Sequence, residues 1–321
     1  MRWEHKMTPK NILAQHGRQL GTLCGLIGLV LVFWILTPYF LTVSNLLNIA
    51  QQTSINAIIA VGMTFVIITA GIDLSVGSIV AFSGVVMARA LQSGTPLPLA
   101  ILLGLGVGLL CGLVNGVLIS WGNLPPFIST LGMMSVARGA ALLYTEGRPV
   151  SGFSGSLRWL STGEVAHIPS PVIIMVVVYG IAHFVLGHTK LGRYAYAMGG
   201  NEEAAILSGV SVRIYKTGVY GLCGAFSGLA AVILTARLNS AQPIAGMMYE
   251  LDAIAATVIG GTSLMGGEGT VLGTLIGALI MGVLRNGLNI LGVSSFVQQI
   301  VIGSVIVVAV LADMALKRQK K

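Results

Sequence analysis

The stretch that decides the fold is residues 19–72, which read QLGTLCGLIGLVLVFWILTPYFLTVSNLLNIAQQTSINAIIAVGMTFVIITAGI. It contains no Lys, Arg, Asp or Glu. A helix crosses the hydrocarbon core of a bilayer in about 20 apolar residues, so this stretch is long enough for two crossings, divided near Pro38. Its apolar residues do not alternate with polar ones as they do in the strands of a membrane β-barrel, so the crossings are expected to be helical.

The overall composition agrees with this local pattern. Of 321 residues, 55% are hydrophobic and 9% are charged, whereas a soluble domain carries about 25% charged residues. The 43 glycines are typical of closely packed membrane helices. These values exclude a cytosolic enzyme, a disordered protein and a disulfide-stapled secreted module. The sequence therefore predicts an all-α polytopic membrane protein with glycine-rich helix packing.

Further uncharged runs extend this pattern along the chain, for example between Arg89 and Arg138 and between Glu164 and Lys190. Pro and Gly residues divide the runs into segments of nearly the length that a crossing needs. The sequence predicts about ten transmembrane helices, of which the eighth is short. The expected spans lie near residues 20–36, 46–70, 74–92, 97–120, 127–145, 169–187, 217–236, 252–266, 269–291 and 296–313.

Basic residues gather in three segments that flank the expected spans. They are Arg2, Lys6, Lys10 and Arg18, then Lys190, Arg193, Arg213 and Lys216, and finally Lys317, Arg318, Lys320 and Lys321. The positive-inside rule places all three segments in the cytoplasm, and ten spans put both termini there. The net charge of +8 is then a topology signal, and its division over three sites argues against a nucleic-acid-binding patch.

This topology divides the chain into a cytoplasmic tail (1–19), a single transmembrane domain (20–316) and a basic cytoplasmic tail (317–321). Two loops are long enough to carry a role. Residues 146–168 fall outside and serve either as a docking surface or as a plain connection. Residues 188–216 fall in the cytoplasm.

The cytoplasmic loop contains the pattern of a short, capped helix. Asn201 is a good N-cap, Glu202 and Glu203 suit the first turn, and Gly209 is a good terminator. A free helix of about two turns is marginal in water, so this one should be docked against something. The residues leave two alternatives open, packing on its own domain or docking into a cytoplasmic partner.

The same loop carries the most specific resemblance to a known family. The stretch Leu191-Gly192-Arg193-Tyr194, continuing through residues 199–205 to Ser208-Gly209, resembles the coupling segment of permease subunits in bacterial ABC importers of monosaccharides. The class meant comprises the ribose, xylose, arabinose and galactose importers. The resemblance covers nearly the whole chain after about Leu31, and it is closest to ribose permeases. Other matching stretches are residues 56–58, 62–64, 71–78, 240–243, 249–256, 260–264, 266–267, 273–278, 286–289 and 291–295.

The resemblance implies a subunit that works only in a complex in the bacterial inner membrane. Its expected partners are a cytoplasmic ABC ATPase, a periplasmic sugar-binding protein, a second permease subunit (a homodimer being favoured) and a monosaccharide. The chain has no P-loop, so ATP and Mg²⁺ are expected on the ATPase, and loop 146–168 would be periplasmic. The ATPase-coupling segment would comprise Gly199, Gly200, Asn201, Glu202, Glu203, Ala204, Ala205, Ser208 and Gly209.

No catalytic or metal-binding pattern is present in the sequence. The five histidines show no metal-ligand spacing, and no Ser, His and acid grouping is readable. The chain is therefore expected to be a transport subunit rather than an enzyme, to bind no metal or cofactor of its own, and to have no nucleic-acid partner.

Polar residues at membrane depth are the candidates for a translocation path, since buried polar groups there are expensive. An uncharged sugar needs hydrogen-bonding groups along its route. The alternative for each residue is a hydrogen bond between helices, which contributes only about 0.6 kcal/mol on average. The candidates are Gln51, Gln52, Asn56, Asp73, Asn115, Arg138, Asp252, Asn286 and Asn289.

Asp73 supports the main rival hypothesis. Lying between Gly71 and Gly77, it suits an N-cap of the third span, with Ser75 assisting. A proton- or sodium-coupled secondary sugar transporter would instead use Asp73 as its coupling carboxylate. A membrane enzyme or channel is the more distant alternative.

Glycine spacing predicts where helices pack closely. Gly104, Gly108, Gly112 and Gly116 recur every four residues in the fourth span, and Gly269, Gly273 and Gly277 do so in the ninth. This is the small-xxx-small pattern of close helix contact.

Overall fold

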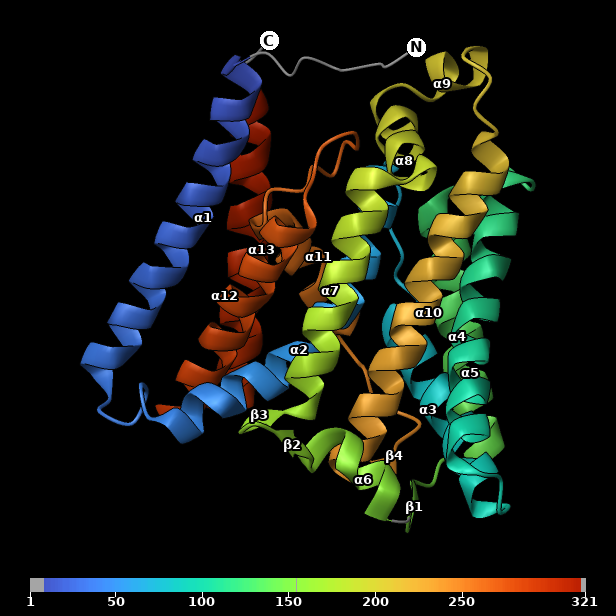
Figure 1. Cartoon of the computed structure of the whole chain (residues 1–321), viewed down its shortest axis with the longest axis vertical. Coiled ribbons are helices and arrows are strands. Elements are labelled where there is room, and N and C mark those ends of the chain that lie inside the picture. Colours follow the sequence, from blue (N-terminus) through green and yellow to red (C-terminus); the bar gives the residue numbers. More distant parts are fainter. Residues whose placement is uncertain (1–8, 154, 319–321) are drawn as a thin grey trace.

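The computed structural model describes residues 9–153 and 155–318, and it is a bundle of helices with small strand pairs at one end (Figure 1). The expected residues Arg2, Lys6, Lys320 and Lys321 lie outside the described part. The helices are α1 (Pro9–Leu36), α2 (Val43–Ile68), α3 (Val76–Gln92), α4 (Leu97–Ser120), α5 (Pro126–Thr145), α6 (Gly155–Thr162), α7 (Ser170–His188), α8 (Lys190–Gly200), α9 (Glu202–Leu207), α10 (Val212–Leu238), α11 (Tyr249–Ile259), α12 (Val271–Ile290) and α13 (Ser295–Arg318).

Each of the ten expected spans falls on a helix, but the helices differ in their ability to cross a bilayer. Within the described residues, α2, α4, α5, α7, α10 and α12 are long and apolar enough to span. Shorter apolar stretches lie in α1, α3 and α13. The predicted polytopic helical fold is confirmed, whereas ten complete spans are not established.

The eighth expected span, 252–266, differs most from its prediction. Its helix, α11, has 11 residues, which at 1.5 Å per residue is about 16 Å, roughly half the hydrocarbon core. Residues 260–270 then form a loop that leads to α12. The physical reason is local, because Gly260-Gly261 and Gly266-Gly267 interrupt the helix, and three of these four adopt positive φ.

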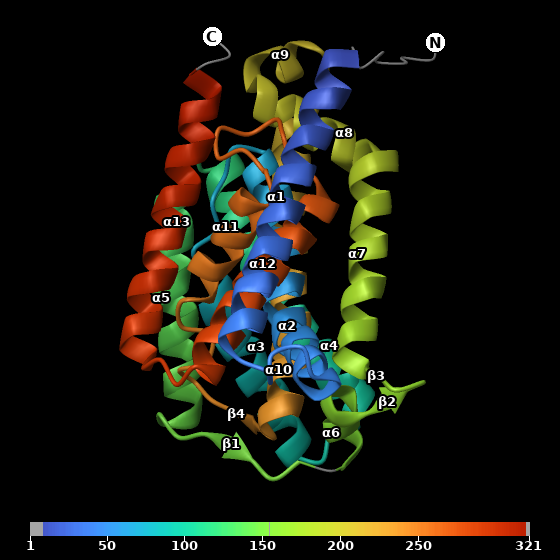
Figure 2. The ribbon, with the colours of Figure 1, turned by 90° about the vertical axis from the view of Figure 1, so that its left-hand side faces the viewer.

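Two helices of the bundle, α3 and α11, are each preceded by an irregular segment. Residues 69–75 follow α2 and lead to α3, and residues 242–248 follow strand β4 (Ser240–Ala241) and lead to α11. Figures 1 and 2 place α3 in the lower half of the bundle and α11 in the upper half. The first turn of α3 touches the second segment at Gly77 and Gly246, where a Cβ on either glycine would overlap the carbonyl oxygen of the other.

Glycine contacts hold the core of the bundle, as the spacing predicted. A Cβ at Gly108 would overlap the carbonyl oxygen of Gly224, and one at Gly112 would overlap that of Tyr220, so α4 packs backbone to backbone on α10. Gly273 and Gly277 bring α12 equally close to α11. Close contacts of this kind are how membrane helices gain packing energy without a hydrophobic driving force.

The two ends of the bundle carry different features (Figure 1). The first residues of α1, the last turn of α13 and helices α8 and α9 lie at one end. Strands β1 (Val150–Ser151), β2 (Glu164–Val165) and β3 (Ile168–Pro169) lie with α6 at the other. β1 pairs with β4, and β2 pairs with β3, both antiparallel. The described basic segments therefore share one end, opposite the 146–168 loop.

The 188–216 loop contains the predicted capped helix and one helix that was not predicted. The Asn201 side chain accepts a hydrogen bond from the backbone N–H of Ala204 at 2.9 Å, and α9 ends before Gly209, whose φ is +81°. α8 precedes it and ends at Gly200. α8 was missed because Gly192, Gly199 and Gly200 lower its helix propensity.

Candidate functional site

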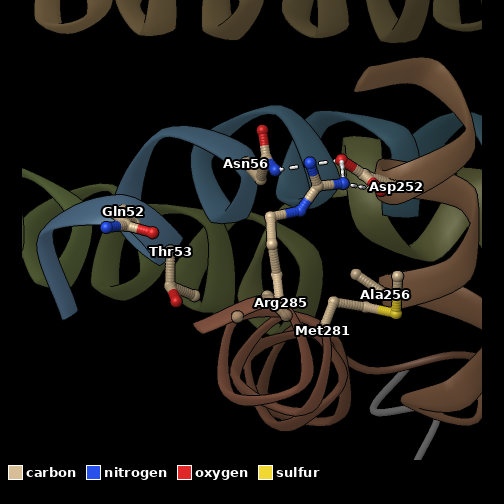
Figure 3. A pocket seen from close by; sticks show the side chains of 9 residues that line it. Gln52, Thr53, Asn56, Asp252, Ala256, Met281 and Arg285 are labelled. Atoms are coloured by element: carbon tan, nitrogen blue, oxygen red, sulfur yellow. Dashed lines mark hydrogen bonds and ion pairs between the residues drawn. The ribbon is translucent and has the colours of Figure 1, made fainter. Parts of the chain in front are cut away.

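One polar contact among the path candidates joins α2, α11 and α12 and contains an ion pair (Figure 3). The Arg285 Nη2 atom donates to both carboxylate oxygens of Asp252, at 2.9 and 2.8 Å, and Asn56 Nδ2 donates to Oδ2 at 3.3 Å. The Asp252 side chain is 4% exposed, and that of Arg285 is 39% exposed. The buried carboxylate is therefore compensated by one cation and one amide, which a charge at membrane depth requires. We call these three residues the Asp252 cluster.

A small cavity adjoins the Asp252 cluster. It has a volume of about 30 Å³ and is lined by Gln52, Thr53 and residues of α11 and α12 as well as by the cluster itself (Figure 3). The buried Thr53 Oγ1 has no hydrogen-bond partner among the described residues. A cavity of this volume holds about one water molecule, so a sugar ring does not fit in this conformation. Gln51 does not line it.

The second polar group surrounds Asp73, which is 0% exposed. Its Oδ1 atom accepts hydrogen bonds from Ser75 N at 2.9 Å and from Ser75 Oγ at 2.5 Å. Asn115 Nδ2 in turn donates to Ser75 Oγ at 2.9 Å, and Ser129 Oγ donates to Asn115 Oδ1 at 3.4 Å. Two path candidates, Asp73 and Asn115, are thus linked through a serine. We call these four residues the Asp73 cluster.

The predicted capping role of Asp73 is wrong in its register. The N-cap position of α3 belongs to Ser75, whose side chain makes no capping bond, and Asp73 binds Ser75 instead of an N–H inside the helix. The difference arises because residues 71–73 have no regular secondary structure and 74–75 form a turn, so the carboxylate bonds the residue two positions ahead. Within the described chain, no Lys or Arg pairs with Asp73.

Arg138 binds backbone and not an acidic side chain. Its Nη1 atom donates to the carbonyl oxygens of Pro243 and Ala245, both at 2.7 Å. These carbonyls lie in the irregular segment before α11, where the helical pattern leaves them without partners. Arg138 therefore joins α5 to that segment. This is a structural contact between two parts of the bundle, the alternative to a role in lining the translocation path.

Asn286 and Asn289 make separate contacts although they are three residues apart on α12. Asn286 exchanges two hydrogen bonds with Asn45 of α2, at 2.9 and 3.0 Å. Asn289 Oδ1 accepts one from Gln298 Nε2 of α13 at 2.8 Å. Both contacts are hydrogen bonds between helices, the alternative that the sequence left open.

Helix α9, which lies within the predicted coupling segment, is held to the chain on one side and exposed on the other. Lys216 Nζ lies 2.7 Å from Glu202 Oε2, and Ala205 packs in an apolar cluster with Met198 and Val212. Ile206 and Leu207 at the tip are 55% and 88% exposed. The structure shows the first alternative, because one face packs on its own domain; docking into a partner stays a prediction, for which the exposed apolar tip is available.

Sequence reasoning missed several contributors to these groups. Thr53 was not singled out, because a lone hydroxyl in an apolar run carries no distinctive pattern. The apolar tip of α9 could have been found from Ile206-Leu207 next to Ser208-Gly209. Among the described residues, no group of three His, Cys, Asp or Glu side chains could hold a metal ion.

Comparison with known proteins shows which family the chain resembles. Residues 45–310 match the family described as "Branched-chain amino acid transport system / permease component". The chain is 51% identical over 296 residues to the ribose import permease protein RbsC of Escherichia coli K12, covering 91% of this chain and 92% of that protein. It is 51% identical over 298 residues to RbsC of Bacillus subtilis, covering 92% of each. The D-allose transport system permease protein AlsC of E. coli K12 is 42% identical over 300 residues, covering 93% of this chain and 92% of that protein. No solved structure matches the chain.

Proposed function

Because the chain belongs to this family of transport permease components, we propose that it is the membrane-spanning subunit of an ATP-driven ABC importer that moves a ribose-like monosaccharide into the cytoplasm. It is a multi-pass protein of the bacterial inner membrane. The observation that carries the proposal is the likeness to ribose import permeases over about nine tenths of the chain.

The proposed orientation puts the α8–α9 end in the cytoplasm and the α6 end in the periplasm. This orientation is consistent with ten membrane-crossing segments and two cytoplasmic termini when α11 and the irregular segment before it are counted as one crossing. The shared location of the described basic segments supports this orientation, since Lys and Arg favour the cytoplasmic side.

Each end of the helix bundle has its own proposed partner. A cytoplasmic ABC ATPase, which would carry ATP and Mg²⁺, would receive the exposed Ile206 and Leu207 of α9. A periplasmic sugar-binding protein would dock on the α6 end. This chain itself would bind neither nucleotide nor metal.

The second permease subunit would be another copy of this chain. Helices α5 and α13 edge the same side of the molecule, at the left of Figure 2. Both expose large apolar side chains, including Val136, Leu143, Phe296 and Ile300. We propose that this side meets the second copy and that the sugar path forms there, since the cavity beside Asp252 holds about one water molecule.

A co-purification experiment tests the proposal. The tagged chain is extracted in mild detergent with its ATPase co-expressed, and the same is done for Leu207→Asp. We expect the ATPase to accompany the wild-type chain and to be lost from the variant, because a charge would replace the apolar tip.

The matched control is Val165→Asp, which places the same charge on an exposed apolar residue at the opposite end. It should retain the ATPase. A wild-type chain that never brings an ATPase with it would contradict the proposed function.

A further inference from the structure

The last turn of α8 meets two irregular segments, or breaks, one after α2 and one between α11 and α12, backbone to backbone. A Cβ at Gly199 would overlap the carbonyl oxygen of Ile68 and would lie 2.5 Å from Gly267 N. Gly267 N also donates a hydrogen bond to Ile68 O at 2.9 Å. Ile68 ends α2, and Gly267 lies in the loop between α11 and α12. We call Ile68, Gly199 and Gly267 the three-way junction.

A second contact ties α8 to the same loop. The Tyr196 hydroxyl donates to the carbonyl oxygen of Gly269 at 2.6 Å. Burial raises the pKa of Tyr196 to about 12, so the hydroxyl stays protonated and able to donate at neutral pH. Figure 1 shows the α11–α12 loop rising beside α8.

The opposite side of α8 is joined to the coupling helix. Met198 packs with Ala205 of α9 and Val212 of α10, and the rings of Tyr194 and Tyr215 meet edge to face with centroids 4.6 Å apart. The Glu202–Lys216 ion pair adds a link between α9 and α10. A displacement of α9 therefore carries α8 with it, because close-packed groups transmit strain.

Each break at the junction leads to one polar cluster. Ile68 is followed directly by residues 69–75, which contain Asp73 and Ser75. The loop that contains Gly267 connects α11, which carries Asp252, to α12, which carries Arg285. A movement at the junction thus reaches the Asp73 cluster through one segment and the Asp252 cluster through the other.

We propose that Gly199 and Tyr196 are positioning residues that transmit the movement of the coupling helix to both breaks, so that ATP-driven motion rearranges both polar clusters together. The proposal rests on the proposed importer function. A backbone contact without a side chain suits this task, because no flexible group lies between α8 and the breaks to absorb a displacement. Contacts of this kind couple two sites only if the connected elements can adopt two conformations. Transport requires two such conformations, one open to each side of the membrane.

The test uses the whole complex reconstituted in liposomes and measures the coupling ratio, which is sugar taken up per ATP hydrolysed. In Gly199→Ala the new methyl group would separate α8 from Ile68 and Gly267. We expect the ATPase to remain bound and to hydrolyse ATP, while the coupling ratio falls about tenfold, within the range that coupling mutations produce.

Gly187→Ala is the matched control, since it makes the same change near the end of α7, where a Cβ meets nothing within 4 Å. Its coupling ratio should equal that of the wild type. The proposal is overturned if Gly199→Ala also keeps the wild-type ratio, or if it lowers uptake and hydrolysis in equal proportion.

Tyr196→Phe decides the matter if Gly199→Ala does not fold, because it removes one hydroxyl without changing the packed volume. Loss of that hydrogen bond should lower the coupling ratio about threefold. An unchanged ratio would overturn the role of Tyr196. These outcomes are distinct from failure of the importer function, in which the wild-type complex itself would show no ATP-dependent uptake.

Discussion

Asp73 and Asp252 are both buried carboxylates at the start of a helix that follows an irregular segment, yet their surroundings differ. Asp252 has a cation, Arg285, bound through both oxygens. Asp73 has only hydrogen-bond donors on Ser75, with no Lys or Arg paired to it in the described chain. The two carboxylates therefore differ in how far they are compensated, since Asp252 is paired with a cation, whereas the buried Oδ2 atom of Asp73 has no hydrogen-bond partner among the described residues.

The largest expected effect comes from breaking the compensation of Asp252. Arg285→Met removes the cation and leaves a buried carboxylate, so we expect the free energy of unfolding to fall by about 3 kcal/mol, the lower end for a buried pair because Arg285 is partly exposed. Denaturation of the purified chain in detergent measures it. Arg285→Met combined with Asp252→Asn should recover most of the loss, and equal losses in the single and double variants would contradict the pairing.

A smaller effect is expected from the donors to Asp73. Ser75→Ala removes the Oγ that donates to Asp73 and accepts from Asn115, so we expect a loss of about 2 kcal/mol in the free energy of unfolding. Ser83→Ala on the same helix is the control, because the buried Ser83 Oγ has no partner among the described residues. The interpretation fails if the two serine variants unfold alike.

The smallest effect is expected from Asp73 itself. Asp73→Asn keeps an Oδ1 acceptor for Ser75, although a neutral hydrogen bond is weaker than one to a carboxylate. Because the contact itself remains, we expect ATP-driven sugar uptake by the reconstituted complex to stay within about twofold of the wild type. A secondary transporter that uses Asp73 would lose uptake entirely. Abolished uptake with a folded, ATPase-bound chain would therefore favour that rival.

Local patterns in the sequence were sufficient for much of the fold. The apolar runs predicted the helices, Asn201 and Gly209 predicted the ends of α9, and the spacing of Gly108 and Gly112 predicted a close helix contact. Each of these depends on residues within a few turns of one another. Gly and Pro also marked the breaks between helices. They predicted that the eighth span is short, but not that its helix ends at Ile259.

The partners of the polar residues could not be predicted in the same way. Asn56 and Asp252 are 196 positions apart, and Arg138 binds carbonyls more than 100 positions away. Such contacts depend on how whole helices pack, which periodicity does not encode. The roles of these residues in a sugar path stay predictions.

The proposed role as the permease of an ATP-driven ribose importer is tested by uptake of radiolabelled ribose into liposomes. The liposomes contain this chain with its ATPase, the sugar-binding protein is added outside, and no proton or sodium gradient is imposed. We expect ribose to accumulate only when ATP is present on the side that α9 faces. Ribose accumulation driven by a proton or sodium gradient, without ATP or the partner proteins, would contradict it.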